Sequence, residues 1–175
     1  MPGFRLAARR SVPWLSIVLC AGGVNAQTCI VLSPPRIASG VASMDLSIYS
    51  GRGNEPAAVQ WTFQYPSTSI KTLTVDDGPA LKGAGKTALC AGDAAAYNCL
   101  TAGASTKTIA NGIIAKVTAV LAPGATKAVI MIKSALGTSI AGDPILVRSK
   151  IIPISGADDS SDCIPQAQKK AGVSK

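Results

Sequence analysis

The sequence predicts an all-β protein, a β-sandwich of about nine short strands. Apolar and polar residues alternate with a period of two in several segments, which is the pattern of a strand with one buried face and one face in water. Turns rich in glycine and proline separate these segments, and no segment has the periodicity of an amphipathic helix. Together these observations favour two packed sheets over a helical or mixed fold.

The segment 57–65 shows the alternation most clearly. Its polar residues alternate with one apolar face, formed by Val59, Trp61, Phe63 and Tyr65. Large apolar side chains each contribute about 1.5–3 kcal/mol when they are buried. We therefore expect this segment to be a central core strand and not a platform for a ligand.

The other strands follow from the same pattern along the chain. The segment 41–49 alternates, and 70–75 is a strand that ends at the turn signal Asp76-Asp77-Gly78-Pro79. The segment 113–121 alternates again, with one side formed by Ile113, Ala115, Val117, Ala119 and Leu121. The remaining predicted strands are 29–32, 86–90, 98–101, 127–133, 144–148 and 150–154.

The first residues predict export from the cytoplasm. An arginine-rich start is followed by the apolar run 12–19 and by small residues that end at Ala26. Residues 1–26 are therefore expected to be a signal peptide, and no later run is long and apolar enough to cross a membrane. Lipidation at Cys20 is disfavoured because Leu19 precedes it where a small residue would be expected.

The rest of the chain is expected to hold one domain and a tail. Residues 27–155 carry all the predicted strands, and a chain of this length builds a single core. Residues 156–175 are polar and have no apolar rhythm, so we interpret them as a flexible tail. The expected location is secreted, either periplasmic or extracellular.

Four cysteines follow the predicted signal peptide, and an exported protein with an even number of cysteines is expected to form disulfides. Cys90 and Cys99 bracket a short loop between two predicted strands, so a bridge that closes a hairpin fits them. A bridge between Cys29 and Cys163 follows only by elimination, and Cys163 could equally be free. Paired C-x-x-C spacing is absent, which argues against a structural zinc site.

Composition gives no support to catalysis and little to nucleic-acid binding. The chain has no histidine, the commonest general base. Without the three arginines of residues 1–26 the formal net charge falls from +8 to +5, and this excess comes from scattered residues. We therefore expect a protein that is not an enzyme and has no cofactor. Calcium has no recognised loop motif, but it could bind if several aspartates met in space, namely Asp45, Asp76, Asp77, Asp93 and Asp143.

Two motifs resemble cohesin-like domains. The run Asn111-Gly112-Ile113-Ile114-Ala115 with the strand after it resembles a late-strand signature of that family, and 59–66 resembles an early aromatic strand. The resemblance spans most of residues 29–155 and implies a jelly-roll (Ig-like) β-sandwich. It also implies a non-catalytic module that binds a dockerin-type protein partner in a polysaccharide-degrading system. No binding residue is carried over, because no residue motif marks the family's contact face in this sequence.

Two alternatives stand beside the protein-binding module. The first is a carbohydrate-binding module of the same sandwich type, which needs exposed aromatic rings in one plane to stack on sugars. Tyr49 and Tyr97 are the candidate ligand-facing aromatics, since the other mature aromatic residues belong to the predicted core strand. The second is a structural envelope protein without a small ligand. The sequence alone does not decide among the three functions.

Overall fold

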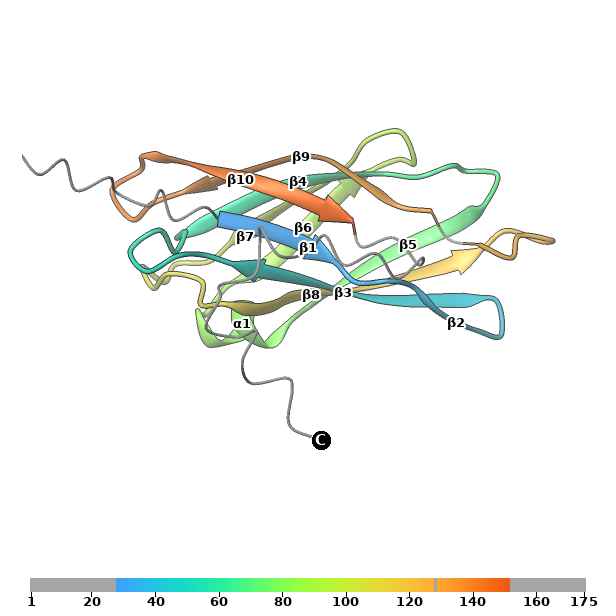
Figure 1. Ribbon diagram of the computed structural model, residues 1–175, viewed down its shortest axis with the longest axis horizontal. Helices are drawn as coiled ribbons and strands as arrows, with labels where there is room; N and C mark the ends of the chain where they lie inside the picture. The colour runs from blue at the N-terminus through green and yellow to red at the C-terminus, as the bar shows by residue number, and fades with distance from the viewer. Residues whose placement is uncertain (1–27, 128, 152–175) are drawn as a thin grey trace, which may run out of the picture.

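The computed structural model describes residues 28–127 and 129–151, which form strands and one short helix (Figure 1). The elements in chain order are β1 Thr28–Leu32, β2 Arg36–Ala38, β3 Val41–Tyr49, β4 Ala58–Gln64, β5 Ile70–Asp77, α1 Pro79–Gly83, β6 Thr87–Gly92, β7 Tyr97–Ala102, β8 Gly112–Leu121, β9 Met131–Thr138 and β10 Pro144–Ile151.

The strands form a β-sandwich of two layers. The first layer has the order β5-β8-β3-β1, with β2 paired to the free end of β3, and the second has the order β10-β9-β4-β7-β6. The layers are joined where β1 pairs with β10 in parallel, so the strands follow one continuous hydrogen-bonded path. In Figure 1 β10, β9 and β4 lie above β1, β3 and β8. The predicted fold class is confirmed.

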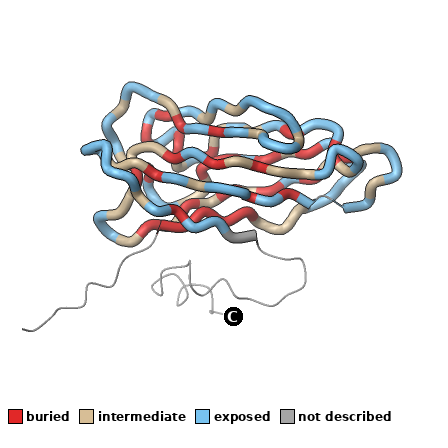
Figure 2. Tube along the Cα trace, turned by 90° about the horizontal axis from the view of Figure 1, so that it is seen from above, coloured by how far each residue is buried: buried red, intermediate tan, exposed pale blue. Residues whose placement is uncertain are grey.

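The core lies between the two layers, and Figure 2 shows the buried positions running along the inside of the elongated body. The inward side chains of β4 are almost fully buried, with Val59 2%, Trp61 1% and Phe63 0% exposed. The rings of Trp61 and Phe63 pack edge to face, with centroids 6.3 Å apart. The prediction that this strand is the centre of the core is confirmed.

The strands β5 and β6 are the two ends of the hydrogen-bonded path, and they are joined by a side chain and not by a backbone ladder. Asp77 at the end of β5 accepts hydrogen bonds from the Thr87 hydroxyl and the Ala88 N–H of β6, both at 2.7 Å. The helix α1 follows Gly78, where a Cβ would collide with the carbonyl oxygen of Ile113. Leu81 of α1 is fully buried and closes this end of the core.

Several predicted element bounds are wrong. The strand expected at 127–133 is β9, which begins only at Met131, and the segments 144–148 and 150–154 belong to one strand, β10, as far as Ile151. Asp76 and Asp77 belong to β5 and not to a turn. The sequence pattern also missed β2 and α1, which at three and five residues are too short to show a period.

The buried side of β8 also differs from the prediction at one point. The register between β3 and β8 shifts between Leu46 and Ser47, which pair with Ala115 and Ile113. Ile114 is the extra residue, and it is fully buried, whereas Ile113 is partly exposed. This β-bulge reverses the alternation at the start of the strand, which period-two reasoning does not anticipate.

Some predictions concern residues outside the described part of the chain. These are the signal peptide 1–26, residues 152–155 of the predicted domain, the tail 156–175 and Cys163. Within the described residues, no helix is long and apolar enough to cross a membrane.

Candidate protein-binding face

The outward face of the second layer carries a row of four leucines and one glutamine that crosses all five strands. Leu89 of β6 pairs with Leu100 of β7, Leu100 pairs with Gln60 of β4, Gln60 pairs with Leu136 of β9, and Leu136 pairs with Leu146 of β10. Residues that pair directly in register project to the same side of a sheet. We call these four leucines, with Gln60 at their centre, the leucine row.

The leucine row is exposed. Leu89 is 55%, Leu100 48%, Leu136 41% and Leu146 69% exposed. Their chain neighbours Cys99 and Val147 are buried, so the alternation of each strand points the leucines away from the core. A single exposed leucine needs no explanation. The row instead has two pairs of exposed leucines, Leu89 with Leu100 and Leu136 with Leu146, on either side of Gln60, which makes this face a candidate interaction surface.

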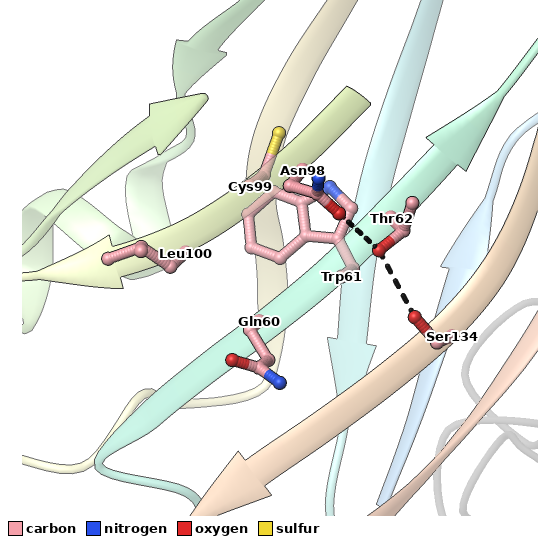
Figure 3. A pocket seen from close by; sticks show the side chains of 7 residues that line it. All are labelled: Gln60, Trp61, Thr62, Asn98, Cys99, Leu100 and Ser134. Atoms are coloured by element: carbon pink, nitrogen blue, oxygen red, sulfur yellow. Dashed lines mark hydrogen bonds between the residues drawn. The ribbon is translucent and has the colours of Figure 1, made fainter. Parts of the chain in front are cut away.

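A row of polar side chains lies beside the leucine row. Thr62 of β4 stands between Asn98 of β7 and Ser134 of β9, and its hydroxyl is within 2.8 Å of Asn98 Oδ1 and 3.1 Å of the Ser134 hydroxyl (Figure 3). The Thr62 hydroxyl donates to the amide oxygen and accepts from Ser134. These bonds fix the three side chains against the sheet, so the surface beside the leucines is preorganised.

Two open depressions flank Gln60 on this face. One of about 190 Å³ lies over the polar row and Leu100, and Figure 3 shows the side chains that line it. The other, about 220 Å³, lies between Leu100 and Leu136 and includes Ala58 and Thr138. Small-molecule pockets are typically about 300–1,000 Å³ and enclosed. This shallow relief fits the side chains of a protein partner better than a cofactor.

The charge distribution on the face is one-sided. The strands β4, β6 and β7 carry no charged residue, while exposed basic residues lie on β9, Lys133, and on β10, Arg148. An uncharged group of strands with basic residues on one side of it, here called the basic margin, is the composition expected of a protein–protein interface core and rim. The margin favours a partner with acidic side chains on that side.

The structure does not bring the two candidate sugar-stacking aromatics together. Tyr49 ends β3 in the first layer, opposite Cys29, whereas Tyr97 begins β7 in the second layer, opposite Phe63. Tyr97 is therefore on the inward side of its sheet and packs against the core. The two rings share no face on which a sugar could stack.

Tyr97 belongs to a small cluster at the end of the β6–β7 hairpin. The pKa of Tyr65 is raised above its ordinary value, chiefly because the side chain is partly buried and secondly because Tyr97 and Asp93 lie nearby. The backbone N–H of Tyr65 donates to the carbonyl of Ala94 in the hairpin loop, at 3.0 Å. These contacts hold the hairpin loop against the end of β4, so we assign the cluster a structural role.

The aspartates do not form a metal site. Among the described residues, no three histidine, cysteine, aspartate or glutamate side chains lie together in a way that could hold an ion. Two of the aspartates bond backbone N–H groups instead, Asp77 at β6 and Asp93 within the hairpin loop. Asp143 accepts a hydrogen bond from Ser139 at 3.4 Å.

The predicted disulfide between Cys90 and Cys99 is present. The two residues pair directly across β6 and β7, and their Cα atoms are 4.1 Å apart. Cys29 is disulfide-bonded as well and is fully buried. Its predicted partner, Cys163, lies outside the described residues, so that pairing stays a prediction.

This arrangement of strands matches solved cohesin structures. The sixth cohesin of scaffoldin B from Acetivibrio cellulolyticus, solved in complex with a dockerin, has a TM-score of 0.60 at 13% identity over 71% of this chain and 94% of that chain. The fold is cohesin-like. The cohesin of the OlpC complex from Clostridium thermocellum gives 0.57 at 13% identity, over 71% of this chain and 90% of the other.

The cohesin-like fold is not confined to cellulose-degrading assemblies. A non-cellulosomal cohesin from the archaeon Archaeoglobus fulgidus has a TM-score of 0.54 at 12% identity, over 75% of this chain and 96% of that chain. No family model and no curated protein matches the sequence. The likeness therefore rests on the fold, and the resemblance seen in the sequence motifs is confirmed at that level.

Sequence reasoning missed the leucine row. Each leucine is a single outward residue on a different strand, and only the sheet register brings the four together. The one available signal was that Leu89 and Leu100 each lie next to a predicted disulfide cysteine in the hairpin. That signal required the register of β6 and β7 to be known.

Proposed function

We propose that this protein is an exported, non-catalytic binding module that holds a protein partner on the leucine row. The cohesin-like fold supports the general role, since two of the similar cohesins were solved as dockerin complexes. A dockerin-type module is accordingly the partner class that we propose. The predicted signal peptide supports export to the periplasm or the extracellular space.

The observation that carries the proposal is the exposure of four leucines in one register-aligned row. Interfaces gain most of their free energy from a few residues near a centre that is depleted of charge, and the contacts around this centre exclude water. The leucine row, the polar row beside it and the basic margin have this composition. Sugar binding has no comparable support, because the exposed row contains no aromatic ring.

The test is affinity capture with the folded domain and matched variants. The domain is immobilised, exposed to exported proteins of the source organism, and the retained protein is identified and titrated by calorimetry. Leu100→Glu and Leu136→Glu are expected to weaken its binding about tenfold or more, because each places a carboxylate beside the apolar side chain of a paired leucine. The same immobilised domain is also exposed to insoluble polysaccharides.

The control is Val120→Glu, which makes the same chemical change on the first layer. Val120 is 39% exposed on β8 and projects outward between Val41 of β3 and Thr72 of β5. This variant should bind the partner as the wild type does. Loss of binding by Val120→Glu with retention by the leucine variants would refute the proposed face, and retention of polysaccharide alone would favour the carbohydrate-binding alternative.

A further inference from the structure

The strand β6 pairs with β7 along all six of its residues, but its side chains contribute little to the core. None of its six residues is buried, and only the small side chains of Ala88 and Cys90 pack against the core. By comparison, β7 buries Cys99 and Thr101. On its other side β6 is held by the Asp77 carboxylate, which reaches only its first two residues, Thr87 and Ala88.

The disulfide lies next to the part of β6 that contributes to the leucine row. Cys90 pairs with Cys99 on the inward side, and the adjacent pair, Leu89 with Leu100, projects outward. A shift of one residue between two strands turns every side chain to the opposite face, and a shift of two separates pairs that had been in contact. The bond between Cys90 and Cys99 forbids both shifts.

We propose that the Cys90–Cys99 disulfide is the register lock of the leucine row, holding Leu89 beside Leu100 and so completing the β6 end of the row. The inference rests on the proposed function for its biological meaning, since a lock matters if the row binds a partner. The juxtaposition itself is a property of the isolated protein and is measurable without any partner.

The lock opens by thiol–disulfide exchange with a dithiol reductant. A thiolate attacks one sulfur of the bond and forms a mixed disulfide while the other cysteine leaves as a thiolate and is protonated. The second thiol of the reductant then displaces the first cysteine, so the protein gains two electrons and two protons and the reductant becomes a disulfide. In the reduced protein Leu89 is expected to leave Leu100, while β4, β7, β9 and β10 stay paired.

The experiment is methyl NMR on protein with ¹³C-labelled leucine methyl groups, before and after reduction with dithiothreitol. In the oxidised protein a nuclear Overhauser effect is expected between Leu89 and Leu100, and another between Leu136 and Leu146. After reduction the first should fall about fivefold or more and the second should remain. The pair Leu136–Leu146 is the matched control, because β9 and β10 carry no disulfide between them.

A Cys90→Ala/Cys99→Val variant repeats the test without reductant and leaves every other disulfide intact. It should behave like the reduced protein at Leu89 and like the oxidised protein at Leu136. Persistence of both contacts after reduction and in the variant would overturn the lock, since the hairpin turn and Asp77 would then suffice. Loss of both contacts in the variant would overturn it as well, because the bond would then hold the whole fold and not one register. Failure of partner capture would leave these readings unchanged.

Discussion

Asn111 connects the end of β3 to the start of β8 through its side chain. Its Oδ1 accepts from the Ser50 N–H at 2.7 Å and its Nδ2 donates to the Ser50 carbonyl at 3.1 Å, so the amide pairs with the backbone as a strand would. Ser50 is 3% exposed, and its backbone groups would be poorly reached by water without this partner. The Asn-Gly step that resembles cohesins therefore has a structural role in this chain.

Asn111→Ala is expected to lower the free energy of unfolding by about 1–3 kcal/mol, because it leaves two backbone groups of a buried residue unpaired. Asn111→Asp keeps an acceptor for the Ser50 N–H but sets a carboxylate against the Ser50 carbonyl, so it should also destabilise. Urea unfolding measures both changes. Unaltered stability in the two variants would show that the side-chain pairing contributes nothing.

Trp61 and Gln60 are neighbours in sequence with opposite environments. Trp61 is 1% exposed in the core, and Gln60 is exposed at the centre of the leucine row. Trp61→Ala should reduce the free energy of unfolding by about 3–5 kcal/mol, a large part of the about 5–15 kcal/mol typical of a domain. Gln60→Ala should change it by no more than about 0.5 kcal/mol.

Guanidinium unfolding of the two variants side by side checks this contrast. A stable Trp61→Ala protein would contradict the core assignment. The pair also separates folding from binding, since Gln60 is the position at which a loss of affinity without a loss of stability is expected.

At the scale of elements, alternation located the long strands and failed for the short or interrupted ones. The strand β3 has the predicted bounds and β4 differs from them by one residue at each end, because both have one fully apolar and one polar face. The strand β9 has no such contrast. Gly137, in the second half of β9, is buried, and a Cβ added to it would lie 3.1 Å from a methyl carbon of Val147. Neighbouring side chains fill this inward position, so the sequence has no large apolar residue there to mark the strand.

The hairpin β6–β7 was predictable because its cysteines gave a second, independent signal. Removal of the Cys90–Cys99 bond by Cys90→Ala/Cys99→Val is expected to lower the free energy of unfolding by about 2–3 kcal/mol, the loop-closure entropy of so short a loop. Thermal and urea unfolding of the variant and the oxidised parent measure the loss. An equal or higher stability of the variant would mean that the bond does not restrict the unfolded chain appreciably.

A second disulfide involves the strand β1. Cys29 of β1 is disulfide-bonded, and we expect Cys163 to be its partner. Such a bond would link the chain after β10 to β1, the strand that pairs with β10. Peptide mapping without reductant should yield one fragment that contains both residues. A free Cys163 that alkylates in the native protein would refute this pairing.

At the scale of the molecule, fold and candidate site differed in how far the sequence could predict them. The fold follows from many local patterns that agree with one another, and it survives errors in single bounds. The leucine row depends on four separate strand pairings, each of which must be correct to one residue. Apart from the cysteine pair of the β6–β7 hairpin, local sequence patterns carry no information on such pairings, so the whole row became visible only in the assembled sheet.

The central claim is that the outward face of the second layer binds a protein partner, and hydroxyl-radical footprinting of the complex tests it most directly. Side-chain oxidation is measured by mass spectrometry in the free domain and in the domain saturated with its captured partner. Leu89, Leu100, Leu136 and Leu146 should become protected, while Val120 on the first layer should be oxidised equally in both states. Protection of Val120 with unchanged oxidation of the four leucines would contradict the claim.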